Sequence, residues 1–239
     1  MTIIEYINCD NIIVKFENKE IKKTKYCHFK SGQIKSKYDK IVYVIGYEGE
    51  GKYKISINNK HTEEYRTWIH MLERCYSNKY HVKFPTYKDC IVYEEWHNFQ
   101  NFAKWYNENY YNVNNETMCL DKDILYKGNK IYSPNTCMFV PEYINTLFTQ
   151  RTNDRGNELI GVKYWESKNS FGYRARCSIK KNGKVKNINL GNYNTELEAF
   201  YAYKQFKEKY IKQVADEYKD KIPKKLYNAM YSWKVEIND

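Results

Sequence analysis

The 239-residue sequence lacks any apolar run close to the roughly 18 to 20 residues that a membrane-spanning helix needs. Its N-terminus also lacks a basic start followed by a continuous apolar stretch, so no secretory signal is expected. With 42% hydrophobic and 29% charged residues, the composition excludes a membrane protein and a disordered chain of low hydrophobicity. We therefore expect a folded, soluble protein of the cytoplasm.

The seven cysteines are odd in number, and no two of them form a C-x-x-C pair. A zinc ribbon and a disulfide framework are therefore not expected, and we interpret the cysteines as reduced thiols, most of them in the core. The five histidines show no H-x-x-x-H pair or other metal-ligand spacing. We expect structural or surface roles for them.

Positive charge is in excess, because 40 Lys and Arg stand against 29 Asp and Glu and give a net charge of +11. The excess belongs to the two flanks: residues 1–60 carry +5, residues 61–150 carry −2 and residues 151–239 carry +8. Residues 171–190 alone hold six positive charges and no acid. A basic soluble chain without a membrane anchor usually has a polyanionic partner, and nucleic acid is the leading one.

The pattern predicts an α+β protein of three parts, residues 1–60, 61–150 and 155–239. In the first part, strand-like runs alternate with turn residues, which predicts a small β-rich domain, either a barrel or a meander. Its basic stretch, residues 21–37, either contacts phosphates or forms an exposed, solubilising face. The predicted strands are Ile3–Tyr6, Ile12–Phe16, Ile41–Tyr47 and Tyr53–Ile57, with a turn at Glu17 and Asn18.

Two stripes rich in aromatic residues open the middle part. Their spacing of three and four residues places each stripe on one side of a helix, and core packing explains them better than a stacking surface for bases. A short strand, a Gly-Asn turn and a Ser-Pro turn then lead to a helix that begins near Pro141, an arrangement that can hold a metal ion. The stripes are Tyr65, Trp68, Met71, Leu72 and Cys75, then Trp96, Phe99, Phe102 and Trp105.

In the last part, apolar and polar residues alternate over 173–180, which gives one face of a strand to the core and the other to solvent. A strand at 161–165 precedes it, and an Asn182-Gly183 turn predicts a hairpin with a third strand. The inward residues are Val162, Tyr164, Tyr173, Ala175, Cys177, Ile179, Ile188 and Leu190.

A helix after Gly191 supplies the cover that a small antiparallel sheet needs in water. Thr195 and Glu198 form a capping-box pair at its start, and two alanines allow close approach to the sheet. We therefore expect a three-stranded antiparallel sheet packed on a helix. The apolar stripe of the helix is Ala199, Ala202, Tyr203, Phe206, Tyr210 and Val214.

The opposite face of this sheet is free to enter a groove of DNA, where arginine can pair with guanine and asparagine with adenine. The candidate DNA-binding residues are Lys163, Trp165, Arg174, Arg176, Ser178, Lys180, Lys184, Asn187 and Asn189.

These segments resemble the ethylene-response-factor (ERF) type of DNA-binding domain, known from plants and from phage and mobile-element endonucleases. The resemblance covers residues 158–215 and implies double-stranded DNA as the partner. Asn189 stands where the plant domains usually have tryptophan, and Arg176 where they usually have an acid, so the base preference of the family does not carry over. The motifs are GVKYW (161–165), YRARCSIKKNGK (173–184) and INLGNYNTELEAFYAY (188–203).

The segment 65–148 resembles phage HNH-like proteins, in which W-x-x-M-x-x-R-C-Y precedes an E-W-x-x-F-x-x-F helix and a later Y-S-P turn. The resemblance implies a ββα-metal-type fold and a divalent ion, Mg²⁺ or Mn²⁺, held by Asp121 and Asn145. The motif residues are Trp68, Met71, Arg74, Cys75 and Tyr76, then Glu95, Trp96, Phe99 and Phe102, then Tyr132, Ser133 and Pro134.

The implied catalytic residues depart from the HNH pattern. Lys122 stands where the histidine base belongs, and Thr136, with Asn135 beside it, where a loop-orienting asparagine is usual. A lysine of ordinary pKa is protonated at neutral pH and cannot accept a proton from water. Either Asp123 serves instead, or cleavage has been lost; His97, on the aromatic helix, could also reach the motif.

We expect a phage-type DNA-binding protein built on an HNH homing-endonuclease scaffold with an eroded or unusual active site. One alternative is an active, metal-dependent homing or nicking endonuclease. The other is a non-catalytic factor that binds RNA or protein. Metal-dependent nicking of a plasmid separates the first two, and a steep salt dependence with preference for duplex DNA separates both from the third. The sequence leaves the recognition site and the oligomeric state open.

Overall fold

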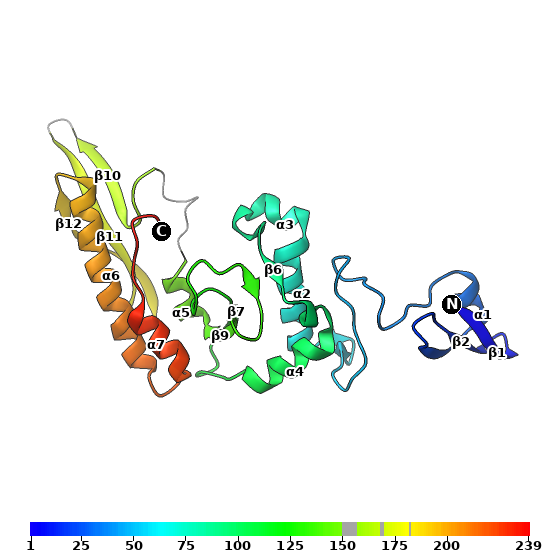
Figure 1. Ribbon diagram of the computed structural model, residues 1–239. Helices are drawn as coiled ribbons and strands as arrows, with labels where there is room; N and C mark the ends of the chain where they lie inside the picture. The colour runs from blue at the N-terminus through cyan, green and yellow to red at the C-terminus, as the bar shows by residue number, and fades with distance from the viewer. Residues whose placement is uncertain (150–156, 168–169, 182) are drawn as a thin grey trace. The chain divides into compact units, whose positions relative to one another are not determined.

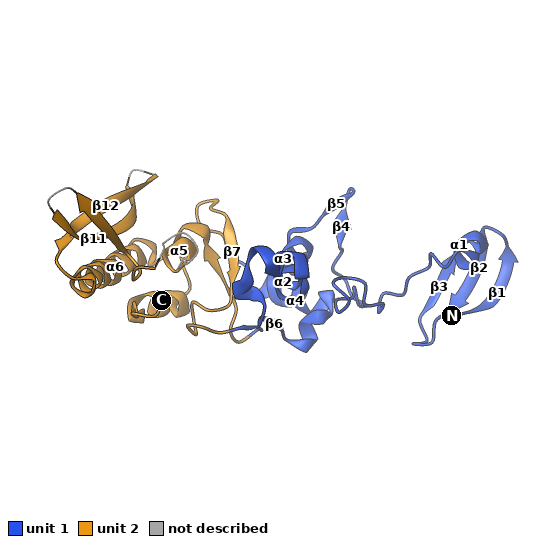
Figure 2. Ribbon diagram, turned by 90° about the horizontal axis from the view of Figure 1, so that it is seen from above, with its two compact units in different colours: residues 1–110, 130–134 blue, residues 111–129, 135–239 orange. Residues whose placement is uncertain are grey.

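The computed structural model describes residues 1–149, 157–167, 170–181 and 183–239. The expected α+β class is confirmed. The chain divides into two compact units, Met1–Tyr110 with Lys130–Pro134, and Tyr111–Asn129 with Asn135–Asp239 (Figure 2). This division differs from the three predicted parts. Among the helices in the described ranges, none has the length and apolarity needed to cross a membrane.

Unit 1 begins with a three-stranded antiparallel meander of β1 (Thr2–Asn8), β2 (Asn11–Lys15) and β3 (Ile21–Thr24), followed by α1 (Tyr26–Lys30). Ile12 and Val14 of the central strand are fully buried. The expected turn at Glu17 and Asn18 is present.

The two later strands expected in this region do not form as predicted. Residues 41–47 make only isolated bridges, from Val42 to Gly46 and from Tyr47 to Asn98. Tyr43 and Val44 take positive φ angles of 50° and 63° and reverse the chain. Of the run Tyr53–Ile57, only β4 (Ser56–Ile57) is a strand, in a short hairpin with β5 (Lys60–His61).

The rest of unit 1 packs two helices, α2 (Glu63–Tyr76) and α4 (Phe99–Asn109), around the aromatic stripes. All the aromatic residues predicted for the core except Tyr65 are buried, so the core-packing interpretation is confirmed. The Trp68 indole N–H donates to the Trp96 carbonyl oxygen at 2.7 Å. The smaller elements are α3 (Asn78–Lys83), the 3₁₀ turns Pro85–Tyr87 and Glu94–His97, and the parallel pair β6 (Ile91–Val92) and β8 (Ile131–Tyr132).

Unit 2 begins with an antiparallel pair, β7 (Met118–Asp121) and β9 (Met138–Pro141), followed directly by α5 (Glu142–Leu147). This ββα unit shares one hydrophobic core with the second half of α6 (Glu196–Tyr218) and with α7 (Lys224–Ser232). The shared core explains why no boundary falls at 150/155. Its fully or nearly fully buried members include Val140, Ile144, Ile211, Val214, Leu226 and Met230.

The remaining sheet of unit 2 has β10 (Val162–Ser167), β11 (Ser170–Lys181) and β12 (Lys184–Tyr193) in antiparallel order, with α6 running along one face (Figure 1). The capping box of Thr195 and Glu198 is confirmed. Of the predicted helix stripe, Ala199, Ala202, Tyr203 and Phe206 pack on the sheet, whereas Tyr210 and Val214 belong to the core shared with the ββα unit. Asn182 of the predicted turn lies outside the described residues. Val162, Ala175, Cys177, Ala199, Phe200 and Tyr203 form the buried core between helix and sheet.

Candidate functional site

Strand register decides which side chains share the sheet face opposite α6, because directly paired residues of neighbouring strands project from the same face. Arg174 pairs with Lys163 on one side and with Asn192 on the other. Arg176 pairs with Asn189, and Ser178 with Asn187. The structure therefore brings together, on one face, Lys163, Trp165, Arg174, Arg176, Ser178, Lys180, Asn187 and Asn189.

Lys184 is placed differently from the other candidates. It pairs with Lys181, in phase with the Ile179–Lys186 pair, so it projects toward the face that carries α6. Asn192 also lies on the face opposite α6, although the alternation of apolar and polar residues in the sequence did not predict it. A register shift between the Ala175 and Arg176 pairs puts one extra residue in β12, and this bulge moves Asn192 into phase with Arg174.

The outward face is strongly basic. It carries four cations, and none of its described strand positions is an Asp or Glu. The one acid on these strands, Glu166, pairs with Phe171 and projects from the other face. The cations are Lys163, Arg174 and Arg176, and Lys180 at the end of β11, whose ammonium lies 4.6 Å from the ring centroid of Tyr143 on α5.

The Trp165 side chain lies beside a glycine of the neighbouring strand. It pairs with Gly172, where an added Cβ would lie 3.4 Å from the indole nitrogen and 2.9 Å from the Tyr193 carbonyl oxygen. A side chain at this position would crowd the Tyr193 carbonyl oxygen, and the indole lies at contact distance above the glycine. The Arg174 guanidinium lies 5.7 Å from the ring centroid, and its Nε donates to the Asn192 side-chain oxygen at 2.9 Å. Arg174 is therefore oriented before any ligand arrives.

The asparagines of this face already use their carbonyl oxygens. Asn187 accepts from the Ser178 hydroxyl at 2.5 Å, Asn189 accepts from the Gly191 N–H at 3.1 Å, and Asn192 accepts from Arg174. Their amide N–H groups are left to act as donors. This arrangement favours contacts with phosphate or base acceptors over the bidentate adenine pairing expected from the sequence.

In the ββα unit, Asp121 ends β7 and anchors the loop that follows. Its Oδ1 accepts from the N–H groups of Asp123 at 2.9 Å and Ile124 at 2.7 Å. Burial, helped by the neighbouring charge of Asp123, raises the pKa of Asp121 to about 6. A nearby cation would relieve this unfavourable environment for the carboxylate.

Lys122 has a structural role. Its side chain is buried, and Nζ donates to the Asp123 carboxylate at 2.8 Å and to the Asn129 carbonyl oxygen at 2.9 Å. Asn129 in turn donates from Nδ2 to the Lys122 carbonyl oxygen at 2.7 Å. Asn129 therefore orients the loop after β7, a contact that sequence reasoning missed, and Lys122 and Asp123 are bonded to each other.

Asn145 lies on α5, the element after β9, so the structure places both expected metal ligands in one ββα unit. A carboxylate and an amide oxygen are hard ligands that suit Mg²⁺ or Mn²⁺, with water or phosphate oxygens needed to complete the shell. Within the described residues there is no metal-binding group of three His, Cys, Asp or Glu. His97 belongs to unit 1, where its Nε2 lies 3.2 Å from the Val92 carbonyl oxygen and burial lowers its pKa.

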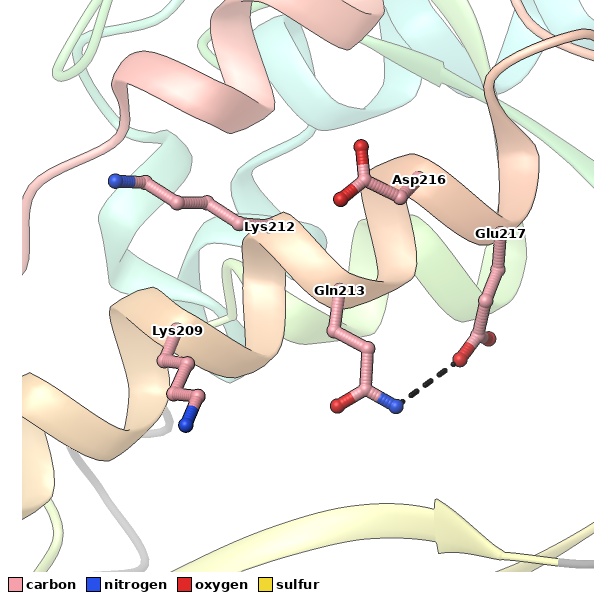
Figure 3. A pocket seen from close by; sticks show the side chains of 5 residues that line it. All are labelled: Lys209, Lys212, Gln213, Asp216 and Glu217. Atoms are coloured by element: carbon pink, nitrogen blue, oxygen red, sulfur yellow. Dashed lines mark hydrogen bonds between the residues drawn. The ribbon is translucent and has the colours of Figure 1, made fainter.

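A surface hollow of about 540 Å³ lies along the second half of α6 and contains none of the predicted site residues (Figure 3). Its lining mixes both charge signs, and Gln213 donates to Glu217 one turn along the same helix at 3.2 Å. It therefore offers no preference for an anion or a cation. No family model, curated protein sequence or solved structure matches this chain.

Proposed function

We propose that this chain binds double-stranded DNA through the face of the β10–β12 sheet opposite α6. The observation that carries the proposal is the composition of that face: four cations, three asparagine side chains with amide donors, and no acid on its described strand positions. Cations neutralise phosphates and release counterions, while arginine and amide donors can contact base edges in the major groove.

The shape of the site favours duplex DNA over duplex RNA. β-strands can enter the wide major groove of B-form DNA, whereas the major groove of A-form RNA is too deep and narrow to be read. The sheet face is held rigid by the packing of Ala175, Cys177 and Val162 against α6. A rigid, preoriented surface loses little entropy on binding.

The decisive experiment compares two exposed cations on opposite faces of the same sheet, Arg176 and Lys186. Arg176→Ala should weaken duplex binding by about 1–3 kcal/mol if the side chain reads a base, and by less if it contacts phosphate. Lys186→Ala removes the same charge from the α6 side and should change the affinity by less than about twofold. Fluorescence anisotropy at several salt concentrations measures both.

Equal losses in the two variants would contradict the assignment of the sheet face. Equal affinity for double-stranded RNA and DNA would favour the RNA-binding alternative. Binding that does not weaken with salt would argue against any phosphate contact and favour a protein partner.

The ββα unit favours a second function, metal-dependent nicking of DNA. Asp121 and Asn145 are the residues that would hold the divalent ion, which supplies an activated water and charge neutralisation when bound. Because Lys122 and Asp123 are tied to each other, this chain provides no positioned base there, a deficit of about 10² to 10⁴ in rate. We therefore propose weak cleavage at most.

Plasmid nicking in Mg²⁺, Mn²⁺ and EDTA tests this second function. Asp121→Ala should abolish any metal-dependent nicking, while Glu142→Gln, which removes an exposed carboxylate from α5, should leave it unchanged. Vigorous nicking by the parent would contradict the eroded site. Absence of nicking in all three proteins would remove catalysis and leave the DNA-binding proposal standing.

A further inference from the structure

Unit 1 has a basic hollow of about 580 Å³ beside the β2–β3 turn, in residues that the sheet of unit 2 does not use. Four lysines line it, from the turn, from β3 and from the loop that follows α1. Glu20, Glu50 and Tyr38 also line the hollow. The lysines are Lys19, Lys22, Lys23 and Lys37.

The loop that carries Lys37 is held onto the turn by a buried serine. Ser36 is only 6% exposed, and its hydroxyl donates to the Glu20 carboxylate at 2.5 Å. The same oxygen accepts from the Asn18 side-chain amide at 2.9 Å and from the Tyr38 N–H at 3.1 Å. These bonds hold the loop that carries Lys37 against the turn that carries Lys19, so the fold brings the two backbone segments together.

The Glu20 carboxylate is occupied by hydrogen bonds within this network. Besides the Ser36 hydroxyl, it accepts from the backbone N–H of Lys37 at 3.0 Å. In the described part of the chain, none of the four lysines forms an ion pair with a carboxylate. Lys22 donates to the Lys35 carbonyl oxygen at 3.0 Å. The ammonium groups of Lys19, Lys23 and Lys37 are therefore free of carboxylate partners.

We propose that this hollow is a second contact with double-stranded DNA, and that it binds the phosphodiester backbone. Ammonium groups act as point charges for phosphate. The residues that line the hollow include no arginine, and their one amide side chain, Asn18, is already bonded to Ser36 and to the Glu20 N–H. The contact is therefore independent of base sequence. The inference takes its ligand from the proposed function but uses none of the same residues.

The test replaces the three free lysines together, as Lys19→Gln, Lys23→Gln and Lys37→Gln, in the full chain. The matched control is Lys79→Gln, Lys88→Gln and Lys104→Gln, three exposed lysines of the same unit with the same total change in charge. Circular dichroism and thermal unfolding verify that both variants fold. Affinity for two duplexes of unrelated sequence is then measured against salt.

Each lost phosphate contact lowers the slope of log affinity against log salt by about 0.9, so the test variant should lose about 2 to 3 units of slope. Between 50 and 200 mM salt the parent should then lose roughly 40-fold more affinity than the test variant. The loss should be the same on both duplexes. The control variant should keep the slope of the parent, and a test variant that behaves like the control overturns the inference.

Acetylation of lysines with and without duplex, mapped by mass spectrometry, separates this inference from the proposed function. Protection of Lys19, Lys23 and Lys37 supports the hollow. If Lys163 and Lys180 stay reactive while these three are protected, the sheet assignment fails and the hollow stands. If only Lys163 and Lys180 are protected, the hollow is overturned. Equal protection by duplex RNA overturns the assignment of DNA as its partner.

Discussion

Lys122 and Asn129 hold each other through two hydrogen bonds, one from the Lys122 ammonium to the Asn129 carbonyl oxygen and one from the Asn129 side chain to the Lys122 carbonyl oxygen. The pair closes the loop that follows β7. A buried lysine bonded in this way supports the loop.

The first prediction concerns this pair. Lys122→Met removes the ammonium while keeping most of the apolar stem, and it leaves the Asn129 carbonyl and the half-exposed Asp123 carboxylate without that partner. The free energy of unfolding should fall by about 1–3 kcal/mol. Lys209→Met, an exposed change in the same unit, should stay within about 0.5 kcal/mol of the parent. Urea unfolding measures both, and equal values would contradict a supporting role for Lys122.

The second prediction is a pH dependence set by Asp121 in metal-free buffer. Its pKa is raised from 3.8 to about 6 by burial, so the folded state binds more protons than the unfolded state between these values. The stabilising contribution is complete below the unfolded pKa and is lost as the pH rises through about 6.

Asp121→Asn tests this dependence, because the amide oxygen can still accept from Asp123 and Ile124 while the charge is gone. At neutral pH the variant should be more stable than the parent by about 1–3 kcal/mol, and the difference should shrink as the pH falls toward 4. Urea unfolding across this pH range gives the result. A difference that does not vary with pH would show that the carboxylate is not perturbed.

The third prediction compares two glycines with nearly equal positive φ, Gly161 at 76° and Gly183 at 75°. A Cβ at Gly161 would lie 2.1 Å from ring atoms of Tyr203, whereas a Cβ at Gly183 would have no atom within 4 Å. Gly183→Ala should cost about 1–2 kcal/mol for the backbone alone, and Gly161→Ala about 1–3 kcal/mol more for the clash with the helix. Thermal unfolding that ranks them equally would argue against the close packing of α6 on β10.

Local patterns in the sequence predicted the elements whose partners are close in the chain. The alternation through Arg174 and Arg176 gave the two faces of β11, and Thr195 with Glu198 gave the start of α6, because both signals act within a few residues. The run 41–47 looked equally like a strand, but the chain turns at Tyr43 and finds no neighbouring strand.

The features that could not be predicted from the sequence depend on strand register and on contacts between distant segments. The outward position of Asn192 follows from a bulge that adds one residue to β12 without any signal in the alternation. The role of Asn129 depends on a loop that returns to Lys122, and the lysine hollow of unit 1 depends on Ser36 reaching Glu20. Each is a contact between segments whose approach is set by tertiary packing.

The last prediction tests whether the ββα unit and the sheet–helix region form one cooperative body. Ile144 of α5 is fully buried in the core that it shares with Ile211 and Val214 of α6. Ile144→Ala should cost about 2–5 kcal/mol through lost burial and a residual cavity. Because α6 spans this core and the core under the sheet, hydrogen exchange should accelerate together in β7, β9, α6 and β11.

The control is Met71→Ala, which creates a cavity in the core of unit 1 and should leave exchange in those segments unchanged. Faster exchange confined to β7, β9 and α5 would instead restore an independent domain boundary near residue 150, since the sheet would then keep its protection without the ββα core.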